Sequence, residues 1–192
     1  MRYPNSSKTY HKVVSHANRG MTLENLINDA NKFYNENNIA VICKKPTPIG
    51  IVSVSGDENS KIITKAYFKE PSTLDYNGVY KGKYIEFDAK QTCSKTSFPI
   101  SNISTHQIEY LKKIINHGAI AFLIIEINNE YYLFSGNVLI KYIEVQKKKS
   151  LPYKLIKELG CKIEPDGLII VNYLPAVDKL IGGLHEKSKE LF

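Results

Sequence analysis

The stretch Tyr84-Ile85-Glu86-Phe87-Asp88-Ala89-Lys90 decides how the rest of the chain is interpreted. Its apolar and charged residues alternate, as they do in a β-strand whose successive side chains point to opposite faces. One face is therefore apolar, and the other carries Glu86, Asp88 and Lys90. Taken alone, the pattern fits a half-exposed strand with a solvated charged face. It also fits a strand that presents two carboxylates and an ammonium group to a catalytic site.

The residues just before this strand favour the catalytic interpretation. Residues 76–80 form a second predicted strand, and the intervening Lys81-Gly82 is typical of a tight hairpin turn. The hairpin brings Asp75 back toward the second strand. An acidic residue at one strand, a turn, and then Asp-x-Lys on the next strand is the arrangement of the PD-(D/E)xK nuclease site. Asp-x-Lys alone is common in proteins, so the preceding carboxylate is what makes the pattern informative.

The chemistry of such a site explains the residue types. Two carboxylates from adjacent strands supply the hard oxygen ligands that Mg²⁺ prefers, and Mg²⁺ keeps several of its waters. The ion lowers the pKa of a bound water and neutralises charge on a scissile phosphate. Lys90 lies on the same strand face as Asp88. It is therefore placed to orient that water or to stabilise the charge that develops on the phosphate.

Hydrophobic periodicity and turn residues predict the remaining elements. One helix is expected to begin at Leu23 with Thr22 as its N-cap, and another to begin at Ser104 and end at Gly118. The other predicted helices cover residues 138–144 and 153–159, and the other predicted strands cover residues 40–43, 49–54, 62–68, 119–127, 131–134 and 168–173. Residues 92–101 are predicted to be a loop. This order indicates an α/β or α+β fold with a mixed central sheet flanked by helices.

Length and composition limit the class of protein. A chain of 192 residues with 43% hydrophobic and 23% charged residues should fold as a globule. We expect one domain over residues 21–192, preceded by a flexible basic arm over residues 1–20, where no acidic residue occurs. The net charge of +7 favours polyanionic partners such as nucleic acid. The sequence shows no signal peptide or membrane-spanning run, so a soluble cytoplasmic protein is expected.

Five stretches of the first 100 residues resemble a known family. They are residues 18–24 (NRGMTLE), 44–48 (KKPTP), 65–69 (KAYFK), 75–85 (DYNGVYKGKYI) and 95–99 (KTSFP). In this order they resemble the RecU family of Holliday junction resolvases, and the similarity continues to residue 111 and more loosely beyond it. The resemblance implies a restriction-endonuclease-like PD-(D/E)xK core with a protruding β-hairpin stalk at about residues 49–66. It also implies a homodimer that uses Mg²⁺ to nick four-way DNA junctions symmetrically in homologous recombination and DNA repair, and whether Mn²⁺ can substitute stays open.

Carried over residue by residue, the resemblance implies catalytic roles for Asp75, Asp88 and Lys90, with Lys90 as the transition-state stabiliser. The implied metal ligands are Thr73, Asp75, Asp88 and Gln107. Two of these have an alternative interpretation, because the Thr73 hydroxyl suits a plain turn and Gln107 stands three residues after Ser104, as in a helix capping box. Asp88 stands where the RecU pattern has Glu. Its side chain is shorter by one methylene group, which can change the metal geometry.

Glu24 and Glu86 are candidate accessory residues, although a carboxylate such as Glu24 is also favoured in the first turn of a helix. The candidate DNA-binding residues are Arg19, Lys44, Lys45, Lys65, Lys69, Lys81 and Lys83. A two-fold pair of sites suits a four-way junction, which has to be nicked on two strands of like polarity. Other recombination proteins are further candidate partners. Two alternatives stay open: another PD-(D/E)xK DNA endonuclease, restriction-like or flap-specific, and a non-catalytic junction-binding recombination module.

Overall fold

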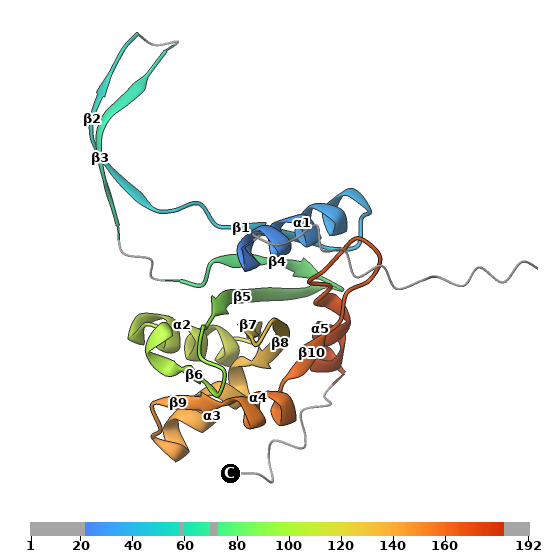
Figure 1. Ribbon diagram of the computed structural model, residues 1–192. Helices are drawn as coiled ribbons and strands as arrows, with labels where there is room; N and C mark the ends of the chain where they lie inside the picture. The colour runs from blue at the N-terminus through green and yellow to red at the C-terminus, as the bar shows by residue number, and fades with distance from the viewer. Residues whose placement is uncertain (1–21, 58–59, 70–72, 183–192) are drawn as a thin grey trace, which may run out of the picture.

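The computed structural model describes residues 22–57, 60–69 and 73–182, and a six-stranded sheet lies at its centre (Figure 1). The strands are, in spatial order, β1 (Val41–Lys44), β4 (Tyr76–Tyr80), β5 (Lys83–Gln91), β7 (Ile120–Ile127), β8 (Glu130–Ser135) and β10 (Cys161–Ile163). β5 and β7 are parallel, and the other neighbours are antiparallel. Parallel neighbours need a crossover connection, which here contains helix α2 (Thr105–Asn116). The predicted mixed sheet is confirmed, whereas the predicted arm over residues 1–20 lies outside the described residues.

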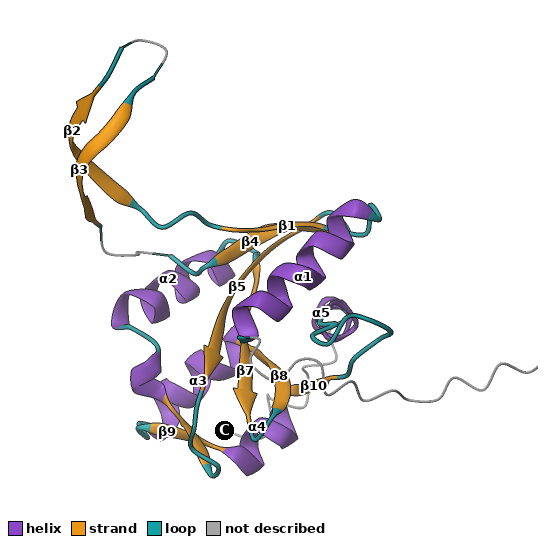
Figure 2. Ribbon diagram, turned by 45° about the horizontal axis from the view of Figure 1, so that its top comes forward, coloured by secondary structure: helices purple, strands orange, loops and turns teal. Residues whose placement is uncertain are grey.

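Helices cover both faces of the sheet. α1 (Leu23–Glu36) and α5 (Leu174–Ile181) pack on one face, and α2, α3 (Gly136–Gln146) and α4 (Tyr153–Leu159) pack on the other (Figures 1 and 2). No helix in the described part of the chain is long and apolar enough to cross a membrane. Between the two cores lies β7, with Phe122 on the α1 side and Leu123 on the α2 side, both fully buried. Burial on both faces explains why this strand is a continuous apolar run.

An aromatic ladder sets the register of the central strands. Tyr76 of β4, Phe87 of β5 and Phe122 of β7 occupy directly neighbouring positions. Their rings stack with centroids 4.9 and 4.8 Å apart, and all three side chains are buried. A slip of one residue would turn this apolar row to the opposite face, so packing strongly specifies the register. Asp75 and Asp88 are sequence neighbours of Tyr76 and Phe87, so the ladder also determines where both carboxylates lie.

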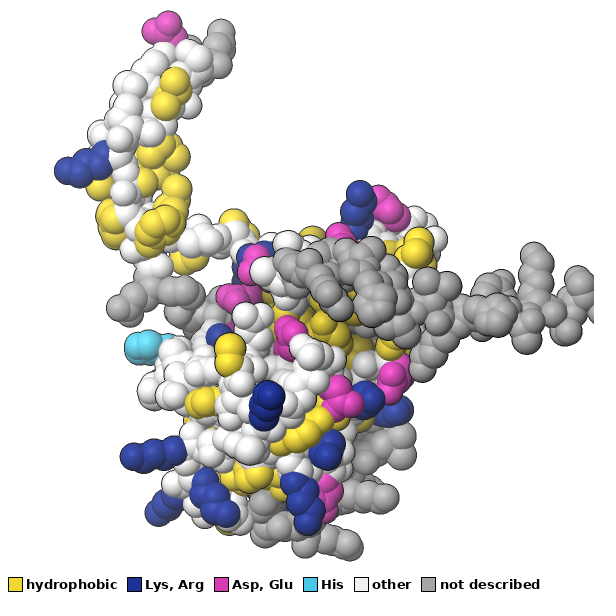
Figure 3. Space-filling view, viewed as in Figure 1, with side chains coloured by type: hydrophobic (Ala, Val, Ile, Leu, Met, Phe, Trp, Pro, Cys, Tyr) yellow, Lys and Arg dark blue, Asp and Glu magenta, His cyan; other side chains and the backbone are white. Residues whose placement is uncertain are grey.

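The predicted β-hairpin stalk is present. Its strands, β2 (Ile49–Ser55) and β3 (Ile62–Phe68), form a separate two-stranded sheet that projects from the body (Figures 1 and 2). The register shifts around Val52, and such a β-bulge bends a hairpin and increases its twist. Apolar side chains follow the stalk in Figure 3, and Phe68 at its base is 81% exposed. A projecting hairpin with exposed apolar surface is typical of an interaction site.

The C-terminal third departs from the sequence prediction. The predicted strand over residues 168–173 is wrong, because this segment makes only an isolated bridge between Asp166 and Ile169. β10, which was not predicted, occupies the edge of the sheet beside β8. The apolar residues pack irregularly instead: Tyr173 is fully buried, with its ring centroid 5.4 Å from that of Tyr34. A short apolar run does not distinguish a strand from another buried segment. Helix α5, which follows, was not predicted either.

The predicted loop over residues 92–101 also contains regular structure. β6 (Ser97–Pro99) lies within it and pairs with β9 (Ser150–Pro152), which is distant in sequence. The paired residues Phe98 and Leu151 are fully buried in the core on the α2 side. A strand of three residues carries too little periodicity to be recognised in a sequence. It forms here because its partner and the core are present.

Glu130 links β8, α4 and β10, and it supports a prediction about stability. Its carboxylate accepts hydrogen bonds from Tyr153 and, at 2.7 Å, from Tyr132, and it lies 3.0 Å from the Lys162 ammonium group. These partners lower the pKa of Glu130 to about 2. Because the folded-state pKa lies below the ordinary value of 4.5, the stabilisation is present above pH 4.5 and is lost as the pH falls toward 2.

We therefore expect Glu130→Gln to reduce the free energy of unfolding by about 1 kcal/mol at pH 7, or a few degrees in Tm. The difference between variant and wild type should shrink steadily as the pH is lowered from 5 to 3. Thermal melts followed by circular dichroism measure both effects. The control is Glu144→Gln, which breaks the exposed Lys112–Glu144 pair and should change Tm little at any pH. A difference that does not depend on pH would contradict the prediction.

Candidate active site

The β4–β5 hairpin brings two carboxylates together. Tyr76 pairs with Phe87, so Asp75 and Asp88 face each other at the open end of the hairpin. The turn at the closed end places Lys81 and Gly82 at φ values of 48° and 71°, which is the left-handed conformation that two-residue hairpin turns require. The Asp75 side chain lies close enough to Asp88 to raise the pKa of that carboxyl group. The hairpin predicted from the sequence thus brings the two acids close together.

Asp88 is fully buried beneath α2. Its Oδ2 atom accepts a hydrogen bond of 2.7 Å from Gln107 Nε2 and lies 2.8 Å from Lys90 Nζ, while its Oδ1 atom accepts the Ala89 N–H at 3.0 Å. Burial, and then the neighbouring Asp75, raise the pKa of Asp88 above its usual range, and Lys90 opposes that rise. The interpretation of this strand face as solvated is therefore wrong, because α2 covers it.

Gln107 lies in the first turn of α2 and forms, with Ser104, the capping box that the sequence suggested as an alternative. The Ser104 hydroxyl accepts the Gln107 N–H at 3.2 Å, and the Gln107 side-chain oxygen accepts the Ser104 N–H at 3.2 Å. Its amide nitrogen is left to donate to Asp88. The capping box and the contact with Asp88 are thus made by the same side chain. In this geometry Gln107 orients the buried carboxylate.

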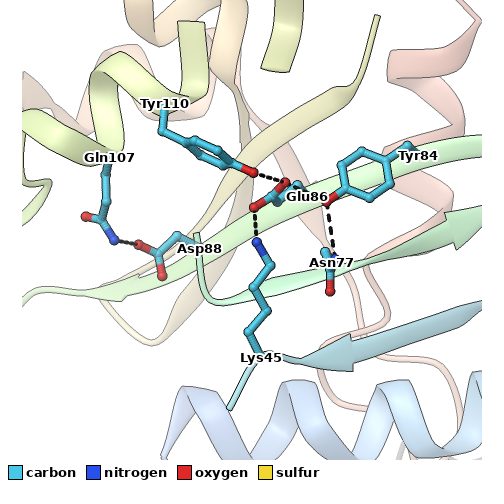
Figure 4. A network of polar contacts seen from close by, with 7 residues as sticks. All are labelled: Lys45, Asn77, Tyr84, Glu86, Asp88, Gln107 and Tyr110. Carbon is cyan, nitrogen blue, oxygen red and sulfur yellow. Dashed lines mark hydrogen bonds and ion pairs between the residues drawn. The ribbon is translucent and has the colours of Figure 1, made fainter. Parts of the chain in front are cut away.

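Glu86 lies two residues before Asp88 on the same strand face and is also fully buried (Figure 4). It accepts hydrogen bonds from the hydroxyl groups of Tyr84, at 2.7 Å, and Tyr110, at 3.0 Å, and it pairs with the Lys45 ammonium group. The sequence reasoning missed both tyrosines. Two signals were available, because Tyr110 follows Gln107 by one helical turn and Tyr84 shares the strand face of Glu86.

A pocket of about 260 Å³ adjoins Asp75 on the α1 side of the sheet. Its lining residues are Thr22, Leu23, Glu24, Asp75, Tyr76, Ala89 and Gln91. Thr22 caps α1 as predicted by accepting the Asn25 N–H, and this places Glu24 in the first turn of the helix. Glu24 pairs with Lys44. The candidate accessory residue Glu24 therefore lies in the same pocket as the candidate catalytic residue Asp75.

The structure separates the candidate DNA-binding residues into two groups. Lys44, Lys45 and Lys81 are in ion pairs within the chain, with Glu24, Glu86 and Asp178 respectively. Lys65, Lys69 and Lys83 are exposed on or near the stalk and the hairpin, and Arg19 lies outside the described residues. Lys44 and Lys81 are exposed as well, but their ammonium groups are shared with carboxylates, so the second group is the better placed to meet phosphates.

The donor set suits a hard divalent cation. Two neighbouring carboxylates repel each other unless a proton or a cation accompanies them, and oxygen ligands are those that Mg²⁺ prefers. Half-buried Thr73 stands two residues before Asp75 and adds a hydroxyl group. Within residues 22–57, 60–69 and 73–182, no three His, Cys, Asp or Glu side chains cluster as a metal site. The Thr73 hydroxyl group and water could complete the shell of an ion held by Asp75 and Asp88.

A carboxylate before a hairpin and Asp-x-Lys on its second strand form the arrangement of the PD-(D/E)xK class of nucleases. Comparison with known families gives a match to RecU, described as "Recombination protein U", over residues 18–179. The chain belongs to the RecU family, as the sequence resemblance predicted.

The relatives are similar over nearly their whole length. Holliday junction resolvase RecU of Oenococcus oeni is 45% identical over 93% of this chain and 92% of its own. Holliday junction resolvase RecU of Oceanobacillus iheyensis is 45% identical over 94% of this chain and 99% of its own. Among solved structures, Hjc of Archaeoglobus fulgidus, a Holliday junction resolvase, covers 72% of this chain and 94% of its own, with 12% identity and a TM-score of 0.43.

Proposed function

We propose that this protein is a Holliday junction resolvase, a structure-specific endodeoxyribonuclease that nicks four-way DNA junctions in homologous recombination and repair. Relatives that carry this name match more than nine-tenths of the chain. The observation that carries the proposal is half-buried Asp75 next to fully buried Asp88, with Lys90 beside Asp88. The proposal includes Mg²⁺ as the cofactor, with Mn²⁺ able to replace it. It also includes residues 21–192 as one nuclease domain.

Each residue of the proposed site has a separate task. A divalent ion held by Asp75 and Asp88, with Thr73 and Gln107, would neutralise charge on the scissile phosphate and lower the pKa of a bound water. The Lys90 side chain is 19% exposed and its ammonium group lies 2.8 Å from Asp88, so it would stabilise the negative charge that develops on a phosphate bound beside Asp88. The hydrogen bond from Gln107 orients Asp88.

Symmetry supports a homodimer as the working unit. A four-way junction has to be nicked on two strands of like polarity, and a two-fold pair of identical sites does this with one surface used twice. The stalk would meet the junction, with Lys65, Lys69 and Lys83 as phosphate contacts. Binding through phosphates falls steeply with salt concentration, so junction affinity should do the same.

The test compares a four-way junction, a flap and a linear duplex under one set of ionic conditions, with and without Mg²⁺. The proposal expects paired, symmetric nicks in the junction, which require the metal ion. Preferred cleavage of the flap or of the linear duplex would instead indicate another PD-(D/E)xK endonuclease. Tight junction binding with no metal-dependent nick would indicate a non-catalytic recombination module.

A further inference from the structure

The buried carboxylate of Glu86 has more polar partners than a single ion pair would give it. Its side chain is fully buried, and it has an ammonium group and two hydroxyl groups as partners (Figure 4). The tyrosines are held in turn: Asn77 donates to the Tyr84 hydroxyl at 3.2 Å, and Lys45 lies over the Tyr110 ring, 5.6 Å from its centroid. A buried charge is costly unless it is paired and hydrogen-bonded, and this one is both. The proposed reaction itself gives Glu86 no task.

Lys45 connects this network to the proposed metal site. Its main-chain N–H donates to the Asp75 carbonyl oxygen at 2.7 Å, while its side chain reaches Glu86. One residue therefore holds the Asp75 main chain and is itself anchored to β5, the strand that carries Asp88. Only 24% of the Lys45 side chain is exposed. Its ammonium group is thus committed to a contact within the chain.

The same residue lies at the base of the stalk. β1 ends at Lys44 and β2 begins at Ile49, so Lys45 is the first residue of the segment that leads into the stalk. The returning strand ends at Phe68, and the chain then leads to Asp75. One side of the stalk therefore contacts Asp75 through Lys45, and the other side leads to Asp75 along the chain. The contact between Glu86 and Lys45 holds the first of these two sides, the segment that leads into β2, against the central sheet.

We infer that Glu86 is a positioning residue, which holds Lys45 and through it Asp75 against the strand that carries Asp88. This inference rests on the proposed metal-dependent nuclease function. It assigns Lys45 to the alignment of the site, in place of the phosphate contact expected from the sequence. Residues that orient metal ligands from outside the ligand shell commonly change metal affinity or activity 10- to 100-fold when mutated. Glu86 does not contact Asp75 itself and acts on it through Lys45.

The experiment uses Glu86→Gln, Lys45→Met and the double variant of the full chain. Three quantities are measured: Mn²⁺ affinity by electron paramagnetic resonance of the free ion, junction affinity without metal ion, and the nicking rate at saturating junction with Mg²⁺. Glu144→Gln and Lys112→Met are matched controls, because they break an exposed ion pair between α2 and α3. The double variant removes both charges together, so it avoids leaving one buried and unpaired if a single variant folds poorly.

The inference expects Mn²⁺ affinity to fall about tenfold in both single variants, and no further in the double variant because the two residues act as one unit. The nicking rate should fall about 10- to 100-fold, with junction affinity within about twofold of wild type. A purely electrostatic effect would change Mn²⁺ affinity in opposite directions in the two single variants. Loss of the Glu86 charge would weaken Mn²⁺ binding, and loss of the Lys45 charge would strengthen it. Opposite changes would therefore overturn the inference.

Two other outcomes would also overturn it. Wild-type Mn²⁺ affinity in all three variants, with only a lower Tm, would show that the network is structural. Weaker metal-free junction binding in Lys45→Met, with a smaller dependence on salt, would show that Lys45 contacts phosphate. Failure of the proposed function is distinguishable from these results, because wild-type protein would then bind Mn²⁺ without nicking the junction. In that case the Mn²⁺ affinities still decide the role of Glu86.

Discussion

Asp75→Asn is expected to lower the nicking rate on a four-way junction about 1,000-fold, and Lys90→Ala about 100- to 1,000-fold. Asparagine keeps the size of Asp75 but removes the charge that, together with Asp88, would hold a divalent ion. Lys90→Ala leaves both carboxylates in place and removes the ammonium group 2.8 Å from Asp88. Single-turnover nicking of a labelled synthetic junction in Mg²⁺ measures both effects.

Binding and folding have to be separated from catalysis in this experiment. Both variants should bind the junction without metal ion about as tightly as wild type, because the stalk and its lysines are unchanged. Their melting curves should remain cooperative. Glu144→Gln serves again as the control that should nick at the wild-type rate. If either site variant cuts at the wild-type rate with its fold intact, the assignment of the catalytic residues is wrong.

Removal of the stalk is expected to abolish the preference for junctions over linear duplex, with a loss of about 100-fold or more in relative affinity. Residues 49–68 are replaced by Asn-Gly, which suits a two-residue hairpin turn. The structure favours this design, because the Lys69 N–H donates to the Pro48 carbonyl oxygen at 2.9 Å and the two ends already lie together. The stalk strands belong to a sheet of their own, so the central sheet should fold without them.

Electrophoretic binding to a junction and to a linear duplex, at one salt concentration, measures this effect. Duplex affinity should change little, because phosphate contacts outside the stalk remain. Lys65→Met in the intact stalk is expected to have a smaller effect. It should lower junction affinity slightly and, when binding is repeated at several salt concentrations, reduce the salt dependence by about one phosphate contact. An unchanged preference for junctions after stalk removal would show that another part of the protein recognises the junction.

Local patterns predicted a large part of this molecule. The cap at Thr22, the capping box at Ser104 and the turn at Lys81-Gly82 all depend on residues a few positions apart, and the structure contains each of them. The hairpin that joins Asp75 to Asp88 is equally local, because its turn has a fixed length. The segments that were missed, β6, β9, β10 and α5, are short and depend on packing partners elsewhere in the chain.

The sequence by itself determined that two carboxylates and a lysine share one end of a hairpin, because alternation along a strand and a two-residue turn are properties of neighbouring residues. Only the tertiary structure decided that α2 covers Glu86 and Asp88, and that Lys45 is paired while Lys65 is exposed. The physical reason is that burial and ion pairing depend on residues far apart in the chain, such as Lys45 and Glu86. No periodicity records those contacts, and they appear only when the sheet and its helices pack together.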